Sequence, residues 1–147
     1  MIFDQLVGWT ARAEPGIKYY SGVAVYRKTF DLAGSLAAKR GASRIFLDLG
    51  DMRELGDVRL NGVDLGILWT PPFRVDITDV VKPAGNALEI KVVNFWPNRI
   101  IGDQFLPEAQ RVTWTNIRKL TRRTPLMPSG LLGPVQLITT LEAPINF

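Results

Sequence analysis

The chain has 147 residues, a length typical of one domain; 46% of them are apolar and 22% charged, which is expected of neither a disordered chain nor a membrane protein. It contains no cysteine, which excludes disulfides and cysteine-based metal sites, and no histidine, which removes the commonest general base and every serine–histidine triad. The net charge is +4, with basic residues concentrated between positions 111 and 123.

The first 16 residues are expected to form a lead-in that Pro15 and Gly16 end, with the folded domain covering residues 17–147. The lead-in has no basic segment followed by an apolar one, so we do not expect a signal peptide. Trp9 stands out in it, because a large aromatic side chain in such a position usually docks onto the rest of the domain.

The chain after the lead-in contains several stretches in which polar and apolar residues alternate, as in β-strands with one buried face. The pair Asn61-Gly62, between alternating apolar residues, predicts a two-residue type I′ hairpin. A helical turn is possible between residues 32 and 43, and residues 97–133 show no sustained period. The expected strands lie within residues 22–32, 43–51, 56–66, 71–81, 87–95 and 133–141.

Short strands separated by turn residues, without a convincing long helix, predict an all-β fold. The single apolar face of each strand suits an antiparallel sheet packed on one side. We therefore expect an antiparallel β-sandwich of about eight strands.

The order of these motifs resembles a known domain. The segments "YYSGVAVYRKTFDL", "IFLDLGDMRELGDVRLNGVDLG" and "PPFRVDITDVVKPAGNALEIKVVN" resemble the sugar-binding-like β-sandwich of family 2 glycoside hydrolases, which has the galactose-binding-like jelly-roll fold. The later segments "NFWPNRIIGDQ", "RVTWTN" and "PSGLLGPVQL" are similar to the C-terminal region of family 106 α-L-rhamnosidases. The resemblance covers roughly residues 9–140, nearly the whole chain.

The resemblance implies a non-catalytic domain of a larger enzyme. In both families the sandwich accompanies a separate (β/α)₈ barrel that carries the catalytic residues, so the expected partners are that catalytic barrel and carbohydrate, with no nucleic acid and no membrane. The parent enzyme is expected to be periplasmic or secreted. No cofactor is expected; a structural calcium is possible, although no Asp-rich loop offers the about six to eight oxygen ligands it needs.

The residues themselves also argue against catalysis. A glycosidase needs two carboxyl groups facing each other across a cleft, about 5 to 9.5 Å apart. The sequence places no two of its carboxylates in this way, and solvated carboxylates on turns and strand faces are common. We therefore predict no catalytic residue in this chain. The acidic residues considered for such a role include Asp48, Asp51, Glu54, Asp57, Asp103 and Glu108.

A candidate site follows the strand at residues 87–95. A sugar site combines a flat aromatic face with amide, carboxylate and guanidinium groups that bind hydroxyls. The same residues could instead stabilise the loop or dock onto the barrel, and both alternatives stay open. The candidates for carbohydrate binding or interdomain contact are Asn94, Trp96, Asn98, Arg99, Asp103, Gln104, Arg111, Trp114 and Asn116.

Three further expectations follow. Trp69 is expected to pack half-buried before the next strand. The basic run at residues 118–124 would suit an anionic polysaccharide, whereas nucleic-acid binding is disfavoured because aromatic residues do not interleave with the basic ones. The alternative to an accessory domain is a free-standing carbohydrate-binding module.

Overall fold

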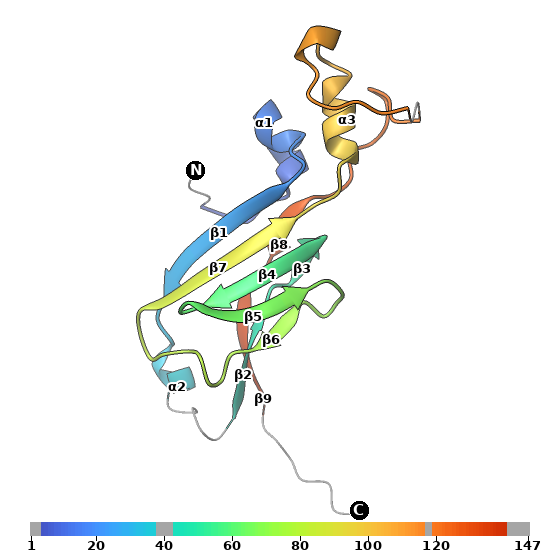
Figure 1. The fold of residues 1–147 in the computed structure, drawn as a ribbon. Helices are drawn as coiled ribbons and strands as arrows, with labels where there is room; N and C mark the ends of the chain where they lie inside the picture. Colours follow the sequence, from blue (N-terminus) through green and yellow to red (C-terminus); the bar gives the residue numbers. More distant parts are fainter. Residues whose placement is uncertain (1–3, 38–42, 117–118, 141–147) are drawn as a thin grey trace, which may run out of the picture.

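The computed structural model describes residues 4–37, 43–116 and 119–140. These residues form nine strands in antiparallel sheets, with short helices at the two ends of the molecule (Figure 1). The predicted all-β sandwich is confirmed, with one strand more than the expected number.

The larger sheet has four strands, all antiparallel to their neighbours. At one end of the sheet, Val93 at the end of one strand lies between Val23 and Leu55, which are the first residues of its two neighbouring strands. The strand order is β1 (Val23–Phe30), β7 (Asn86–Val93), β4 (Leu55–Leu60) and β5 (Val63–Leu68).

The facing layer is built from shorter strands. β2 (Arg44–Asp48) lies between β6 (Arg74–Asp76) and β9 (Gln136–Thr140). β3 (Asp51–Arg53) pairs with β8 (Gly130–Gly133). Neither β3 nor β8 was predicted from the sequence, because three or four residues are too short to show an alternating pattern.

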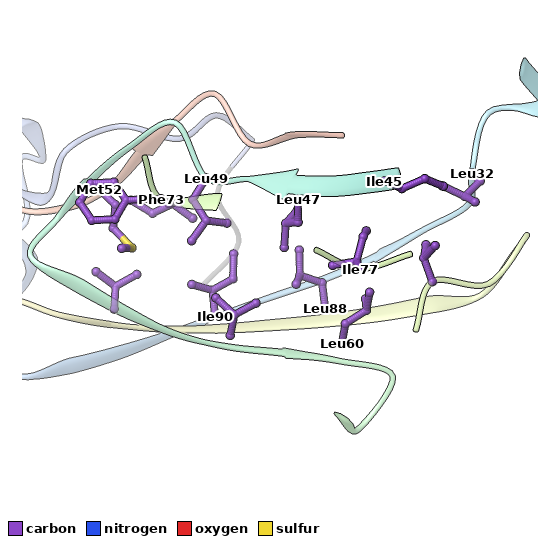
Figure 2. Close-up of a cluster of buried hydrophobic side chains, with 14 of the residues drawn as sticks. Leu32, Ile45, Leu47, Leu49, Met52, Leu60, Phe73, Ile77, Leu88 and Ile90 are labelled. Carbon is purple, nitrogen blue, oxygen red and sulfur yellow. The ribbon is translucent and has the colours of Figure 1, made fainter. Parts of the chain in front are cut away.

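The core lies between the two layers, as the alternating residues predict. Figure 2 shows Ile45 and Leu47 of β2 pointing toward Leu88 and Ile90 of β7, and all four are buried. Trp9 joins this core as expected: it is buried, and its Nε1 donates a hydrogen bond of 2.6 Å to the Tyr26 hydroxyl. The domain boundary after residue 16 stays a prediction.

The hairpin between β4 and β5 is also confirmed. Asn61 and Gly62 have φ values of 54° and 83°, the positive values that a type I′ turn requires. The Asn61 side chain donates hydrogen bonds to the carbonyl of Val80 (2.9 Å) and to Oδ1 of the buried Asn86 (3.0 Å), which ties the hairpin to the next loop. Asn61 therefore serves the turn, as its sequence context suggests.

Five short helices complete the fold, and none in the described residues is long and apolar enough to cross a membrane. The helical turn expected between residues 32 and 43 is present. The irregular segment expected from residue 97 instead begins with a helix, because Pro97 occupies the first helical position, where its missing N–H costs nothing. The helices are η1 (Trp9–Ala11), α1 (Pro15–Lys18), α2 (Gly34–Ala37), α3 (Pro97–Asp103) and η2 (Glu108–Gln110).

Candidate functional site

The candidate site is built on α3, which follows β7 directly and lies at the same end of the molecule as α1 (Figure 1). Gly102 allows the helix to approach the residue that follows α1. A Cβ atom at position 102 would lie 2.6 Å from Cβ and Cγ of Tyr19. A side chain at this position would therefore push α3 away from the body of the domain.

Two of the predicted site residues, Asn94 and Asn98, are buried and satisfied inside the protein. Asn94 accepts a hydrogen bond from the Gly22 N–H (3.0 Å) and donates to the Tyr20 carbonyl (2.8 Å). Both asparagines donate to the buried hydroxyl of Ser129, at 3.2 and 3.0 Å. These amides hold the start of α3 against a distant segment of the chain.

Asn98 also pairs with the backbone of Met127. Its Nδ2 donates to the Met127 carbonyl (2.7 Å), and its Oδ1 accepts from the Met127 N–H (2.8 Å). These two hydrogen bonds match those that a neighbouring β-strand would make with Met127, and they fix α3 to residues 127–129. Asn98 is thus a structural residue of the loop.

Asp103, at the end of α3, is almost fully buried, with a side-chain exposure of 2%. Its Oδ1 accepts from Arg99 at 2.5 Å, and its Oδ2 accepts from the Thr113 N–H (2.8 Å), the Thr113 hydroxyl (2.5 Å) and the Val112 N–H (3.1 Å). Burial alone would raise the pKa of Asp103, but the hydrogen bonds from Thr113 and the Arg99 charge outweigh it and lower the pKa. Asp103 is an ionised carboxylate that ties residues 112–113 to α3.

Gln104 and Arg111 also contact the loop backbone. Arg111 Nε donates to the carbonyls of Asp103 (3.1 Å) and Leu106 (3.3 Å). The carbonyl of Gln104 accepts a hydrogen bond from Arg122, whose guanidinium also lies over the Phe105 ring, 5.4 Å from its centroid. The described part of the basic run therefore packs in part against the loop.

The aromatic candidates, in contrast, face solvent. Trp96 is 48% exposed and Trp114 is 88% exposed, and Asn116 is exposed as well. Three apolar side chains of the same segment that were not among the candidates are also exposed. We refer to the five exposed apolar residues together as the α3-end surface: Phe95, Trp96, Phe105, Val112 and Trp114.

One signal in the sequence indicates the missed members of this surface. Phe95, Phe105 and Val112 are large apolar residues in a segment without any repeating apolar pattern. An apolar residue outside such a pattern has no predicted core position to fill, so exposure was a reasonable expectation for it.

Single apolar side chains are also exposed away from α3. Trp69 was expected to be half-buried, and this expectation is wrong: the side chain is 74% exposed, because β5 ends before it and residues 69–72 do not pack under the sheet. Val23 and Ile67, on the outer face of the large sheet, are exposed too. Val23 pairs with Val93, the last residue of β7, so Val23 adjoins the start of the α3 segment, whereas Ile67 lies on the opposite edge strand, beyond the Lys91–Asp57 ion pair.

Several carboxylates of the described residues are paired with basic side chains. Asp48 lies 2.7 Å from Arg74, Asp51 lies 3.1 Å from Arg53 and Asp57 lies 3.3 Å from Lys91. A glycosidase acid needs a raised pKa. Wherever a carboxyl pKa in the described part departs clearly from its ordinary value it is lowered, as in Glu14, Asp48, Asp76 and Asp103.

No group of three or more acidic side chains that could hold a metal ion occurs among the described residues. The possible structural calcium stays a prediction.

Known proteins with similar sequence and structure are much longer than this chain. A rhamnosidase from Novosphingobium sp. PP1Y is 43% identical over 94% of this chain and superposes with a TM-score of 0.84, but the match covers 13% of the rhamnosidase. A protein of Formosa agariphila described as a putative beta-glucuronidase is 37% identical over 95% of this chain, which spans 14% of that protein. The chain therefore spans about one-seventh of the length of the relatives that it matches.

The comparison with more distant proteins concerns the fold alone. The β-glucuronidase of Ruminococcus gnavus is 24% identical over 63% of this chain, with a TM-score of 0.52. No protein-family model matches the chain. The resemblance seen in the sequence motifs is thus confirmed over nearly the whole chain, as a likeness to one domain-sized part of large glycoside hydrolases.

Proposed function

We propose that this chain, an accessory domain of a glycoside hydrolase, has no catalytic residue of its own and supports the catalytic barrel of an α-L-rhamnosidase-like enzyme. The observation that carries the proposal is the α3-end surface, where five large apolar side chains are exposed within residues 95–114, before and after α3. Exposed apolar side chains concentrated in this way mark an interaction site more often than an ordinary surface.

The loop beneath this surface is rigid because its buried polar side chains are hydrogen-bonded within the chain. Asn94, Asn98 and Asp103 are buried and satisfied by hydrogen bonds to other parts of the chain. A rigid surface loses little conformational entropy when a partner covers it, which favours docking. Burying one large apolar side chain contributes about 1.5 to 3 kcal/mol, so a few of these residues are enough for a stable contact between domains.

A second candidate function is direct contact with carbohydrate. Trp114 is the most exposed aromatic residue of the surface, and Asn116, two residues later, is also exposed. An indole face stacks on the apolar side of a pyranose, and a nearby amide binds its hydroxyls. This pair would extend a substrate cleft of the parent enzyme, or would serve a free-standing carbohydrate-binding module.

A domain exchange tests the accessory role. The Novosphingobium rhamnosidase would carry this chain in place of its own matched segment, and hydrolysis of p-nitrophenyl α-L-rhamnoside and the melting temperature would be measured. We expect the hybrid to retain activity. Changing Trp96 and Trp114 to serine together should lower the stability of the hybrid by about 3 kcal/mol, because two docked side chains lose their contacts.

The matched control is Val63→Ser, which removes an exposed apolar side chain on the hairpin between β4 and β5. It should leave the hybrid unchanged. A Trp96/Trp114 double variant that behaves like this control would contradict docking through the α3-end surface. Titration of the isolated chain with rhamnose oligosaccharides separates the two candidates: affinity that Trp114→Ser abolishes supports sugar contact.

A further inference from the structure

A second feature, away from α3, is an apolar cleft of about 1020 Å³ along one side of the sandwich. Ala24, Tyr26 and Phe30 of β1 line one wall, and Val135 and Leu137, just before and within β9, line the other. On the opposite side of the sandwich β5 contacts β6, which brings the two layers together there. Among the described residues no strand joins β1 to β9, and Leu6 and Trp9 of the N-terminal segment also border the cleft.

Both walls of the cleft are edge strands. In the part of the chain that the structure describes, β1 pairs with β7 alone and β9 pairs with β2 alone. Residues 24–28 of β1 line the cleft consecutively, not at every second position, so the edge of the strand itself borders it. An edge strand presents backbone N–H and C=O groups that another strand can pair with.

The core is incomplete along this cleft. Leu88 and Ile90, on the inner face of β7, are buried. Ala24, Phe30 and Leu137 are only half-buried, although they pack against the same core. Within the described residues, part of the inner apolar surface is therefore uncovered at this edge, where one more layer of side chains would complete it.

We propose that the cleft receives an additional β-strand, supplied by polypeptide other than these 147 residues, which pairs with β1 and inserts alternate apolar side chains between the layers. The inference rests on the proposed function in one respect: it takes the strand from the parent enzyme. In the Novosphingobium rhamnosidase the matched part is 13% of the chain, so most of that chain lies outside it and can supply a strand.

The cleft defines the chemistry of the incoming strand. β1 is eight residues long, so the partner needs a similar length, with apolar residues at every second position. The charged residues that line the cleft are of both signs, Arg27 and Lys28 against Asp4 and Asp31, so the apolar positions define the partner more than its charge does. A small apolar ligand would fill the cleft but would leave the backbone of β1 unpaired.

The test uses this chain, isotopically labelled, and synthetic peptides of about 15 residues that cover the Novosphingobium rhamnosidase outside its matched segment, a length that spans β1 with a margin. Amide hydrogen exchange is measured by NMR for each peptide. We expect one group of overlapping peptides to slow the exchange of β1 amides at least about tenfold, because paired amides open less often.

Ala24→Arg, which places a long charged side chain in the cleft, should weaken binding of that peptide at least about tenfold, or 1.4 kcal/mol. The same change at Val63, an exposed apolar position on the other edge strand of the large sheet, should alter binding less than about twofold. Val135→Arg, on the opposite wall of the cleft, repeats the test if the first variant does not fold.

Three results would overturn the proposal: no peptide protects β1; peptides protect β5 instead; or β1 is already protected in a dimer of this chain, detected by light scattering. Dodecanoate that binds in the cleft, and is blocked by Ala24→Arg while no peptide binds, would show an apolar small-molecule site instead. None of these results involves Trp96 or Trp114, so a failure here is distinct from a failure of the domain exchange.

Discussion

Replacing Asp103 with alanine is expected to lower the free energy of unfolding by about 3 to 5 kcal/mol, because the change removes one partner of a buried ion pair. The Arg99 guanidinium would lose its carboxylate, and the N–H groups of Val112 and Thr113 would lose their acceptor. Urea unfolding followed by tryptophan fluorescence measures the loss. Asp79→Ala, at an exposed aspartate, is the matched control and should change stability by less than about 0.5 kcal/mol.

The same carboxylate makes stability depend on pH. The pKa of Asp103 is lowered in the folded protein, so its contribution is fully present above the unfolded value of about 3.9 and is lost as the pH falls through the folded value. We therefore expect the difference in stability between the native protein and Asp103→Asn to be constant near neutral pH and to shrink below about pH 4. A difference that stays constant into the acid range would contradict the assigned role of Asp103.

Gly130→Ala is expected to destabilise the protein by about 3 to 5 kcal/mol, because it strains the backbone at position 130 and makes the new Cβ atom clash with a neighbouring side chain. Gly130 has a φ of +100°, which side chains other than glycine rarely adopt. A Cβ atom there would also lie within 2.6 Å of Cδ1 of the buried Trp9 ring. The indole would have to move from the core and from its hydrogen bond to Tyr26.

Gly85→Ala provides the control for this substitution. Gly85 also has a positive φ, of 67°, but a Cβ atom there meets nothing within 4 Å. Gly85→Ala should lower the free energy of unfolding only by the strain of the backbone, about 1 kcal/mol. Thermal unfolding of both variants separates the two contributions, and equal losses would show that Trp9 does not constrain position 130.

The faces of the long strands could be predicted from the sequence, because alternation is a local property of the chain. Ile45 and Leu47 of β2, and Ile90 of β7, are buried as expected. The short strands β3 and β8 could not be predicted, since their pairing depends on residues about eighty positions apart and not on their own pattern. Helix α3 was missed although Pro97 at its first position is a known start signal.

The site was harder to predict than the fold. Asn94, Asn98 and Asp103 are residue types that bind sugar hydroxyls equally well as backbone groups. Their partners, such as Ser129, lie about thirty positions away, and the sequence does not reveal that the chain returns to this point. For Trp69 the sequence context indicates packing, but the side chain lies in an exposed stretch, residues 69–72, that follows the end of β5.

The polar and the aromatic residues of the α3 segment thus have different roles. The polar residues inside it stabilise the loop, and the aromatic residues outside it form the surface on which the proposed function depends. This difference explains why residues of a sugar-binding type occur where β7 ends: they hold the loop through hydrogen bonds within the chain.

The central claim is that this chain assists glycoside hydrolysis without performing it. The most direct measurement is the hydrolysis of p-nitrophenyl α-L-rhamnoside and p-nitrophenyl β-D-glucuronide by the purified 147-residue protein. We expect release of p-nitrophenol to stay at the rate of the buffer alone. Turnover by the isolated protein that is abolished when one of its own aspartates or glutamates is changed to the corresponding amide would contradict the claim.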